Sequence, residues 1–146
     1  MTDAEPLFID TNVLVYANVA ESPFHQQALS TIEAAYQAGR ALWISRQILR
    51  EYLVIMSRPQ AFETLPIATV KEQAEQFTQR FVVADETSST TQQLLVLLNR
   101  YTIGGKQIHD ANIVATMQSY NISSVLTANV KDFKRFEDII TIESLT

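Results

Sequence analysis

The stretch LFIDTNVLVY, residues 7–16, decides the fold, because an apolar run stops abruptly at an acid and a second apolar pattern follows it. Residues 6–10 have the length and the β-branched and aromatic content of a buried strand. Residues 12–19 have the pattern of a helix that begins directly afterwards. Asp10 is therefore predicted to lie at the carboxyl end of a buried strand.

The alternation of strand and helix continues along the chain. Further buried strands are predicted at residues 41–45, 81–84, 124–127 and 139–142. Helices are predicted at residues 24–38, 46–57, 66–79, 88–101 and 109–120, with a short one through Phe136. Because parallel neighbours need helical crossovers, the pattern predicts an α/β fold with a mainly parallel central sheet covered on both faces. In such folds, ligands bind outside the carboxyl ends of the strands.

Composition sets limits on the class of protein. The chain has 146 residues, 47% of them hydrophobic, and no linker or repeat, so residues 1–146 are expected to form one domain. It has no cysteine, which excludes disulfides and thiolate metal sites. No apolar run approaches the roughly 20 residues that a membrane span needs, so a cytoplasmic protein is expected. The net charge of −5 argues against a broad electrostatic grip on nucleic acid, unless a bound cation supplies local positive charge.

Three acids occur where the predicted sheet would gather them. Asp10 ends the first strand, Glu51 lies in the helix after the second strand, and Asp110 opens the helix before the fourth. Each also has an ordinary structural explanation. Asp10 and Asp110 suit a helix N-terminus, and Glu51 suits a helix surface beside Arg46 or Arg50. From the residues alone, both explanations stay open, and Asp10 can serve both roles with its two oxygens.

Other polar residues are predicted to reach the same crevice. Thr127, Asn129 and Asp132 follow the fourth strand, and a hydroxyl or an amide there can support a metal-bound water or add an oxygen ligand. Asp132 can equally pair with Lys131 or cap a short helix. His109 is a candidate ligand or base, although a histidine beside a helix start is more often structural or exposed.

Clustered acids predict a cation and a reaction class. Like charges that meet at one sheet edge repel strongly unless a cation neutralises them. Oxygen ligands in a chain without cysteine favour Mg²⁺ or Mn²⁺ over zinc. Such ions lower the pKa of bound water and stabilise both oxygens of an in-line displacement at phosphorus. The residues therefore predict phosphodiester hydrolysis.

Four segments resemble the PIN-domain family, and within it the VapC-type toxins of bacterial and archaeal toxin–antitoxin pairs. The segments are FIDTNVL at residues 8–14, ILREY at 48–52, IHDANIVA at 108–115 and LTANVKDF at 126–133. Their order and spacing cover almost the whole chain. The resemblance implies a three-layer α/β/α fold, Mg²⁺-dependent endoribonuclease activity, a homodimer, and inhibition by a small antitoxin that reaches into the crevice.

The resemblance also implies roles for single residues. Asp10, Glu51 and Asp110 would form the acidic metal cluster, and Thr11, Asn12 and Thr127 would support it. Asn129 would occupy the position where many relatives carry a fourth Asp. Since Asn has no charge, Asp132 is the alternative for that role.

Substrate phosphates are expected to meet basic residues near the crevice. The candidates are Arg46, Arg50, Lys106 and Lys131, with Lys134 and Arg135 close by.

Two rival functions are considered. One is a catalytically weak PIN-like module that binds RNA or a protein without cutting, which the acidic charge and Asn129 favour. The other is a different α/β enzyme, such as an aspartyl phosphatase or a phospho-receiver domain. The phosphatase would need a second Asp two residues after Asp10, where this chain has Asn12, and no glycine-rich phosphate loop occurs.

Overall fold

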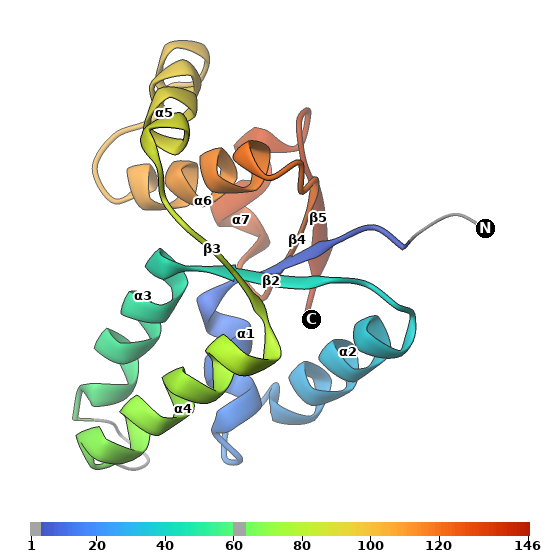
Figure 1. Cartoon of the computed structure of the whole chain (residues 1–146), viewed down its shortest axis with the longest axis vertical. Coiled ribbons are helices and arrows are strands. Elements are labelled where there is room, and N and C mark those ends of the chain that lie inside the picture. The colour runs from blue at the N-terminus through green and yellow to red at the C-terminus, as the bar shows by residue number, and fades with distance from the viewer. Residues whose placement is uncertain (1–3, 60–63) are drawn as a thin grey trace.

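In the computed structural model, residues 4–59 and 64–146 are described, and they form one sheet with helices on both faces (Figure 1). The strands are β1 (Leu7–Ile9), β2 (Leu42–Ser45), β3 (Val82–Ala84), β4 (Ser124–Thr127) and β5 (Thr141–Ser144). The helices are α1 (Thr11–Asn18), α2 (His25–Gln37), α3 (Arg46–Ser57), α4 (Ile67–Arg80), α5 (Ser88–Arg100), α6 (Gln107–Ser119) and α7 (Val130–Phe133), with a 3₁₀ turn at Lys134–Phe136. All strand pairs are parallel, which confirms the predicted fold class.

The first strand and helix follow from the opening stretch of sequence. All residues of β1 are buried, and the Asp10 amide donates the last bond of its ladder to the Leu126 carbonyl at 3.0 Å. The Asp10 side chain then caps α1, since its Oδ1 accepts from the Thr11 amide at 2.8 Å. The chain turns from strand to helix within one residue, as the sequence predicts.

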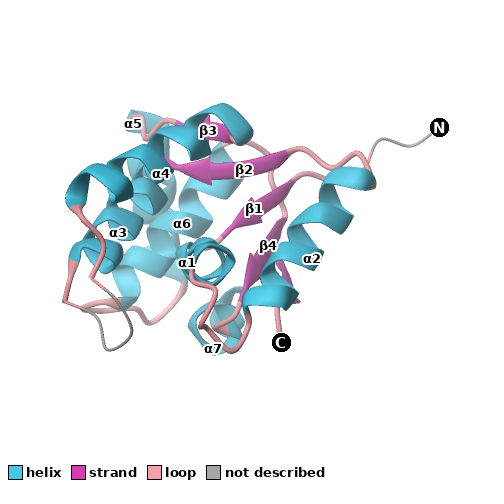
Figure 2. Cartoon of the chain, turned by 90° about the horizontal axis from the view of Figure 1, so that it is seen from below, coloured by secondary structure: helices cyan, strands magenta, loops and turns pink. Residues whose placement is uncertain are grey.

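Two helical layers cover the sheet. Helices α1 to α4 lie on one face, and α5 to α7 lie on the other (Figure 1). From a second direction, α1 and α2 lie in front of β1 and β4, while α6 lies behind the sheet (Figure 2). Strands β1 and β4 are fully buried because helices pack on both faces.

The strand order β3-β2-β1-β4-β5 determines where the site lies. The chain moves outward from β1 to β3 and then returns to place β4 on the other side of β1 (Figure 1). The direction switches between β1 and β4, and in such folds ligands bind in the crevice outside the carboxyl ends of the strands at this point. Asp10 follows β1 there, and Thr127 ends β4.

Two elements begin two residues away from their predicted starts. The last strand lies at Thr141–Ser144 and not at residues 139–142. The Ile139 and Ile140 amides bond to the Phe136 carbonyl at 2.9 and 3.0 Å, and this turn delays strand pairing until Thr141. Helix α6 begins two residues earlier than predicted, at Gln107, whose side chain accepts from the Gly104 amide at 3.2 Å.

Residues 1–3 and 60–63 of the predicted single domain lie outside the described residues. Within the described chain, no helix is long and apolar enough to cross a bilayer.

Candidate active site

Asp10 is a buried carboxylate with several hydrogen-bond donors. Its residue is 7% exposed. Oδ1 accepts from the Thr11 amide, and Oδ2 accepts from the Thr127 hydroxyl at 2.8 Å and from the Asn12 amide group at 3.2 Å. Asp10 therefore both caps α1 and lies in the crevice, the two roles that the sequence left open.

Asn12 and Thr127 join the two strand ends on either side of the switch point. Asn12 Nδ2 donates to the Thr127 hydroxyl at 3.4 Å, and Asn12 Oδ1 accepts from the Ala128 amide at 3.1 Å. The Asn129 amide also donates to the Thr127 hydroxyl, at 2.9 Å. These bonds fix the loop after β4 against the start of α1.

Glu51 reaches the crevice from α3. Its Oε1 accepts from the Thr11 hydroxyl at 3.5 Å, and its Oε2 accepts from Gln47 Nε2 at 3.2 Å. The alternative pairing with Arg46 or Arg50 is wrong. Those arginines pair instead with Asp85 at 3.0 Å and Glu86 at 3.7 Å, on the loop after β3.

Asp110 lies in the first turn of α6 and shares a charged environment with the other acids. Its pKa is raised from 3.8 to about 7; burial is the largest cause, the charges of Asp132, Asp10 and Glu51 add to the rise, and the charge of Arg135 opposes it. These charge effects indicate that Asp110 lies within electrostatic reach of the other three carboxylates.

The other two predicted cluster acids also resist ionisation. Burial is the largest cause that raises the pKa of Asp10 to about 6, with a smaller rise from Glu51 and Asp132, while hydrogen bonds from Thr127 and Thr11 lower it. Burial likewise raises the pKa of Glu51, opposed by its hydrogen bond from Gln47 and by His109. Carboxylates that are costly to ionise are those that a neighbouring cation would stabilise most.

The donor set fits a hard divalent cation, because it consists of carboxylate, hydroxyl and amide oxygens. Among the described residues, no group of three or more His, Asp or Glu side chains is already placed to hold one ion. Direct binding by all three acids therefore requires side-chain rotation, and water bridges are the alternative, which Mg²⁺ commonly retains.

Asn129 and Asp132 differ in how they interact with the other residues of the site. Asn129 is exposed and precedes α7, with its backbone amide bonded to Thr127. Asp132, on α7, raises the pKa of both Asp110 and Asp10 through its charge. Of the two residues, only Asp132 adds negative charge that acts on the other acids.

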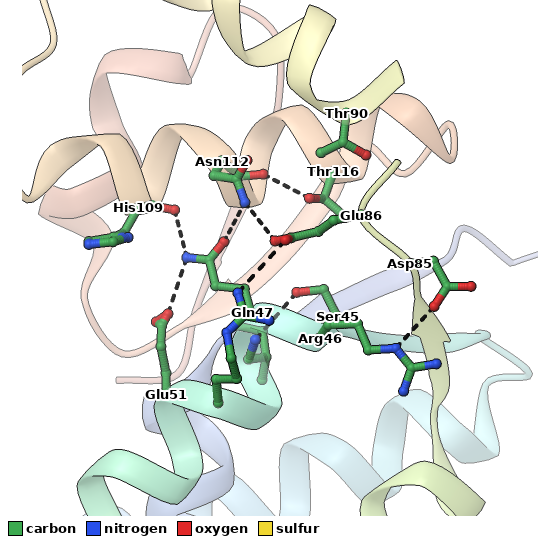
Figure 3. Close-up of polar contacts among 12 residues, drawn as sticks. Ser45, Arg46, Gln47, Glu51, Asp85, Glu86, Thr90, His109, Asn112 and Thr116 are labelled. Atoms are coloured by element: carbon green, nitrogen blue, oxygen red, sulfur yellow. Dashed lines mark hydrogen bonds and ion pairs between the residues drawn. The ribbon is translucent and has the colours of Figure 1, made fainter. Parts of the chain in front are cut away.

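His109 and Asn112, on α6, both bond to Gln47 on α3. The His109 ring is exposed and points away from the Gln47 amide, whereas its backbone carbonyl accepts from Gln47 Nε2 at 2.9 Å (Figure 3). Asn112 Nδ2 donates to Gln47 Oε1 at 2.7 Å and to Glu86 Oε1 at 2.8 Å. Sequence reasoning missed Gln47, although its position four residues before Glu51 places both on one helix face.

The basic candidates lie around the crevice in different ways. Arg50 lines a cavity of about 350 Å³ together with Arg58, Val54 and His109, and Glu51 forms part of the same wall. Arg46 is exposed and points toward Asp85 (Figure 3).

The two predicted lysines are exposed. Lys106 precedes α6, and Lys131 lies on α7. Among the basic candidates, Arg50 shares a cavity wall with Glu51, and the charge of Arg135 acts on Asp110.

Comparisons with known proteins agree with this architecture. A family profile described as PIN domain matches residues 7–139. Ribonuclease VapC48 of Mycobacterium tuberculosis (strain CDC 1551 / Oshkosh) is 27% identical over 134 residues, which are 89% of this chain and 91% of that protein.

Solved structures share the fold at lower identity. VapBC2 from Rickettsia felis, bound to a DNA fragment from its promoter, matches with a TM-score of 0.72 and 20% identity, over 94% of this chain and 97% of that chain. A toxin–antitoxin complex from Klebsiella pneumoniae matches with a TM-score of 0.64 and 20% identity, over 97% and 98% of the two chains.

Proposed function

We propose that this chain, which belongs to the PIN-domain family, is a divalent-metal-dependent endoribonuclease and the toxin of a toxin–antitoxin pair. The observation that carries the proposal is the geometry at the switch point of the sheet, where Thr11 bonds to both Asp10 and Glu51 and the charges of these two acids act on Asp110. The name of the 27% identical relative, Ribonuclease VapC48, supports the reaction class.

The acids would hold the cation between two layers of the fold. Asp10, Glu51 and Asp110 would bind Mg²⁺ or Mn²⁺, with Asp132 as the fourth charge. When bound, such an ion would lower the pKa of water and place positive charge beside the phosphodiester. Thr127 and Thr11 orient the Asp10 and Glu51 carboxylates by donating hydroxyl protons to them.

The substrate strand would approach along the cavity beside Glu51. Arg50 and Arg58 can bind phosphate oxygens there, while Val54 and Ile55 offer an apolar surface to a base. Their positive charge counteracts the acidic balance of the chain near the scissile bond. Arg46, Lys106 and Lys131 would bind phosphates further from the acids.

Cleavage of RNA with and without metal tests the proposal. The purified protein should cut single-stranded RNA with Mg²⁺ or Mn²⁺, and EDTA should stop it. Because water is the proposed nucleophile, the fragments should carry linear phosphate ends. Cleavage that persists in EDTA would show that no metal is needed, and fragments ending in 2′,3′-cyclic phosphate would show that the ribose 2′-hydroxyl, and not water, is the nucleophile.

A PIN-like module that binds without cutting is the second candidate. The net charge of −5 and the lack of a ready-made three-ligand group among the described residues favour it. Calorimetric titration with Mg²⁺ separates the two, because a nuclease loses ion binding in Glu51→Gln whereas a metal-independent module shows no ion binding in either form.

We further propose a small antitoxin partner, a homodimer, a cytoplasmic location and a single domain over residues 1–146. The toxin–antitoxin complex from Klebsiella pneumoniae supports the partner by its shared fold. A short upstream reading frame for a DNA-binding protein that co-purifies with this chain would meet the expectation. Light scattering of the isolated chain would decide between monomer and dimer.

A further inference from the structure

Gln47 is a polar side chain buried at the start of α3, beside the acidic crevice. Its residue is only 5% exposed. Burying an amide is costly unless its hydrogen bonds are replaced, and an aliphatic residue could fill the same space without that cost. The position therefore requires an explanation other than packing.

The amide of Gln47 has a defined polarity. Nε2 donates one proton to Glu51 Oε2 at 3.2 Å and the other to the His109 carbonyl at 2.9 Å. Oε1 accepts from Asn112 Nδ2 at 2.7 Å (Figure 3). A carbonyl and a carboxylate cannot donate, so the nitrogen must face them and the oxygen must face Asn112.

Asn112 holds this polarity from α6. Its Nδ2 donates both protons, one to Gln47 Oε1 and one to Glu86 Oε1 at 2.8 Å. The chain of bonds thus ends on a carboxylate at each side, Glu51 and Glu86, and each amide between them has one favourable orientation (Figure 3).

Glu51 is consequently held from two directions. The Thr11 hydroxyl donates to Oε1 from α1, and Gln47 donates to Oε2 from α3. A carboxylate whose two oxygens are both oriented loses less rotamer freedom when it binds a ligand.

We propose that Gln47, itself oriented by Asn112, is a positioning residue that holds the Glu51 carboxylate ready to bind the divalent ion. The inference rests on the proposed function, because it assigns Glu51 to the metal. Partners that orient metal-binding carboxylates typically change metal affinity or activity by about 10- to 100-fold when they are removed.

The test is Mn²⁺ binding to the full chain by calorimetry, without RNA. Gln47→Met keeps the length and the helix propensity of the side chain and removes its hydrogen bonds. We expect Mn²⁺ affinity to fall by about 10- to 100-fold. Asn112→Ala leaves Gln47 in place but no longer fixes the orientation of the Gln47 amide. Mn²⁺ affinity should therefore fall by less in Asn112→Ala than in Gln47→Met. Equal affinity in all three folded proteins overturns the inference.

The matched control removes a similar bond far from the acids. Gln93 Nε2 on α5 donates to Gln118 Oε1 on α6 at 2.7 Å. Gln93→Met should leave Mn²⁺ affinity unchanged. If Gln93→Met weakens binding as much as Gln47→Met, then Gln47 acts only by joining helices and the proposal is wrong.

A double variant decides whether Gln47 acts through Glu51. In the Glu51→Gln background, Gln47→Met should change Mn²⁺ affinity by less than about 2-fold, because the group it positions is gone. A full additional loss in that background contradicts the proposal. If the wild-type protein binds no Mn²⁺, the proposed function fails together with this inference, whereas wild-type binding that Gln47→Met does not weaken overturns the inference alone.

Discussion

The two walls of the acidic crevice hold their carboxylates by different means. The Asp10 wall consists of Asp10, Asn12 and Thr127, and hydrogen bonds from Thr11, Asn12 and Thr127 satisfy its carboxylate. The Asp110 wall consists of Asp110 and Asp132. The largest causes that raise the pKa of Asp110 are burial and the charges of the other acids, opposed by the charge of Arg135, whereas hydrogen bonds are among the largest causes that lower the pKa of Asp10.

The difference shows what hydrogen bonds achieve beside burial. Asp10 is the more deeply buried acid, yet its pKa rises only to about 6, against about 7 for Asp110. Donors on the Asp10 wall stabilise the charged form before any cation arrives. The Asp110 wall depends on a cation for the same stabilisation.

Neutralising the Asp10 wall should have the largest effect. Asp10→Asn removes the charge but keeps an oxygen for the Thr11 amide, so cleavage should fall by at least about 10²- to 10³-fold while the fold persists. Because ionised Asp10 is costly in the metal-free protein, the variant should unfold at the same or a higher temperature at pH 8. RNA cleavage gels and thermal unfolding measure both.

The matched control for Asp10→Asn is Glu72→Gln, which removes an exposed acid on α4. It should retain wild-type cleavage. Undiminished RNA cleavage by Asp10→Asn would refute the role of the Asp10 wall.

Removing the Thr127 hydroxyl, a hydrogen-bond donor to Asp10, should have the second largest effect. Thr127→Val keeps the buried shape but takes the 2.8 Å hydrogen bond from Asp10, so we expect a loss of about 1–3 kcal/mol in unfolding free energy at pH 8. The pKa of Asp10 should rise further, because that bond lowers it. Urea titration measures the stability.

Thr116→Val is the control for Thr127→Val, since Thr116 is equally buried and its hydroxyl donates to a carbonyl of its own helix. If both variants lose the same unfolding free energy at every pH, Thr127 has no special relation to Asp10.

Much of the Asp10 wall could be predicted from sequence, whereas the linkage behind Glu51 could not. An acid after β1 and a Thr at the end of β4 must lie near each other once the strands are parallel neighbours. The Gln47 to Asn112 bond depends on how α3 and α6 are rotated about their axes, which local pattern does not fix. Arg46 likewise turns to Asp85, on a loop whose path the sequence leaves open.

The shift of the last strand has a similar cause. Residues 139–142 and residues 141–144 both contain β-branched residues, so periodicity alone does not decide where the strand begins. The turn at Phe136 decides it, and that turn depends on the short helix before it.

On the Asp110 wall, two residues compete for the role of fourth acid. Asp132→Asn should weaken Mn²⁺ binding by about 10-fold, at the lower end for residues that support a metal site, because it removes a charge facing both Asp110 and Asp10. Asn129→Ala should leave Mn²⁺ affinity nearly unchanged, since the Asn129 backbone makes its bond to Thr127. Calorimetry measures both, and the reverse ranking would assign the role to Asn129.

The smallest expected effect is a pH dependence of stability in EDTA, and it compares the walls directly. Both acids have a higher pKa in the folded chain than the ordinary 3.8, so the folded state binds more protons and loses stability as pH rises. The loss runs from pH 3.8 to about 6 for Asp10 and to about 7 for Asp110. The unfolding temperature should fall between pH 5 and 8, by about 2–4 °C for each 1 kcal/mol of stability lost. Asp110→Asn should flatten the upper part of this slope and Asp10→Asn the lower part, whereas a chain that becomes more stable toward pH 8 in EDTA would contradict the unpaired state of the Asp110 wall.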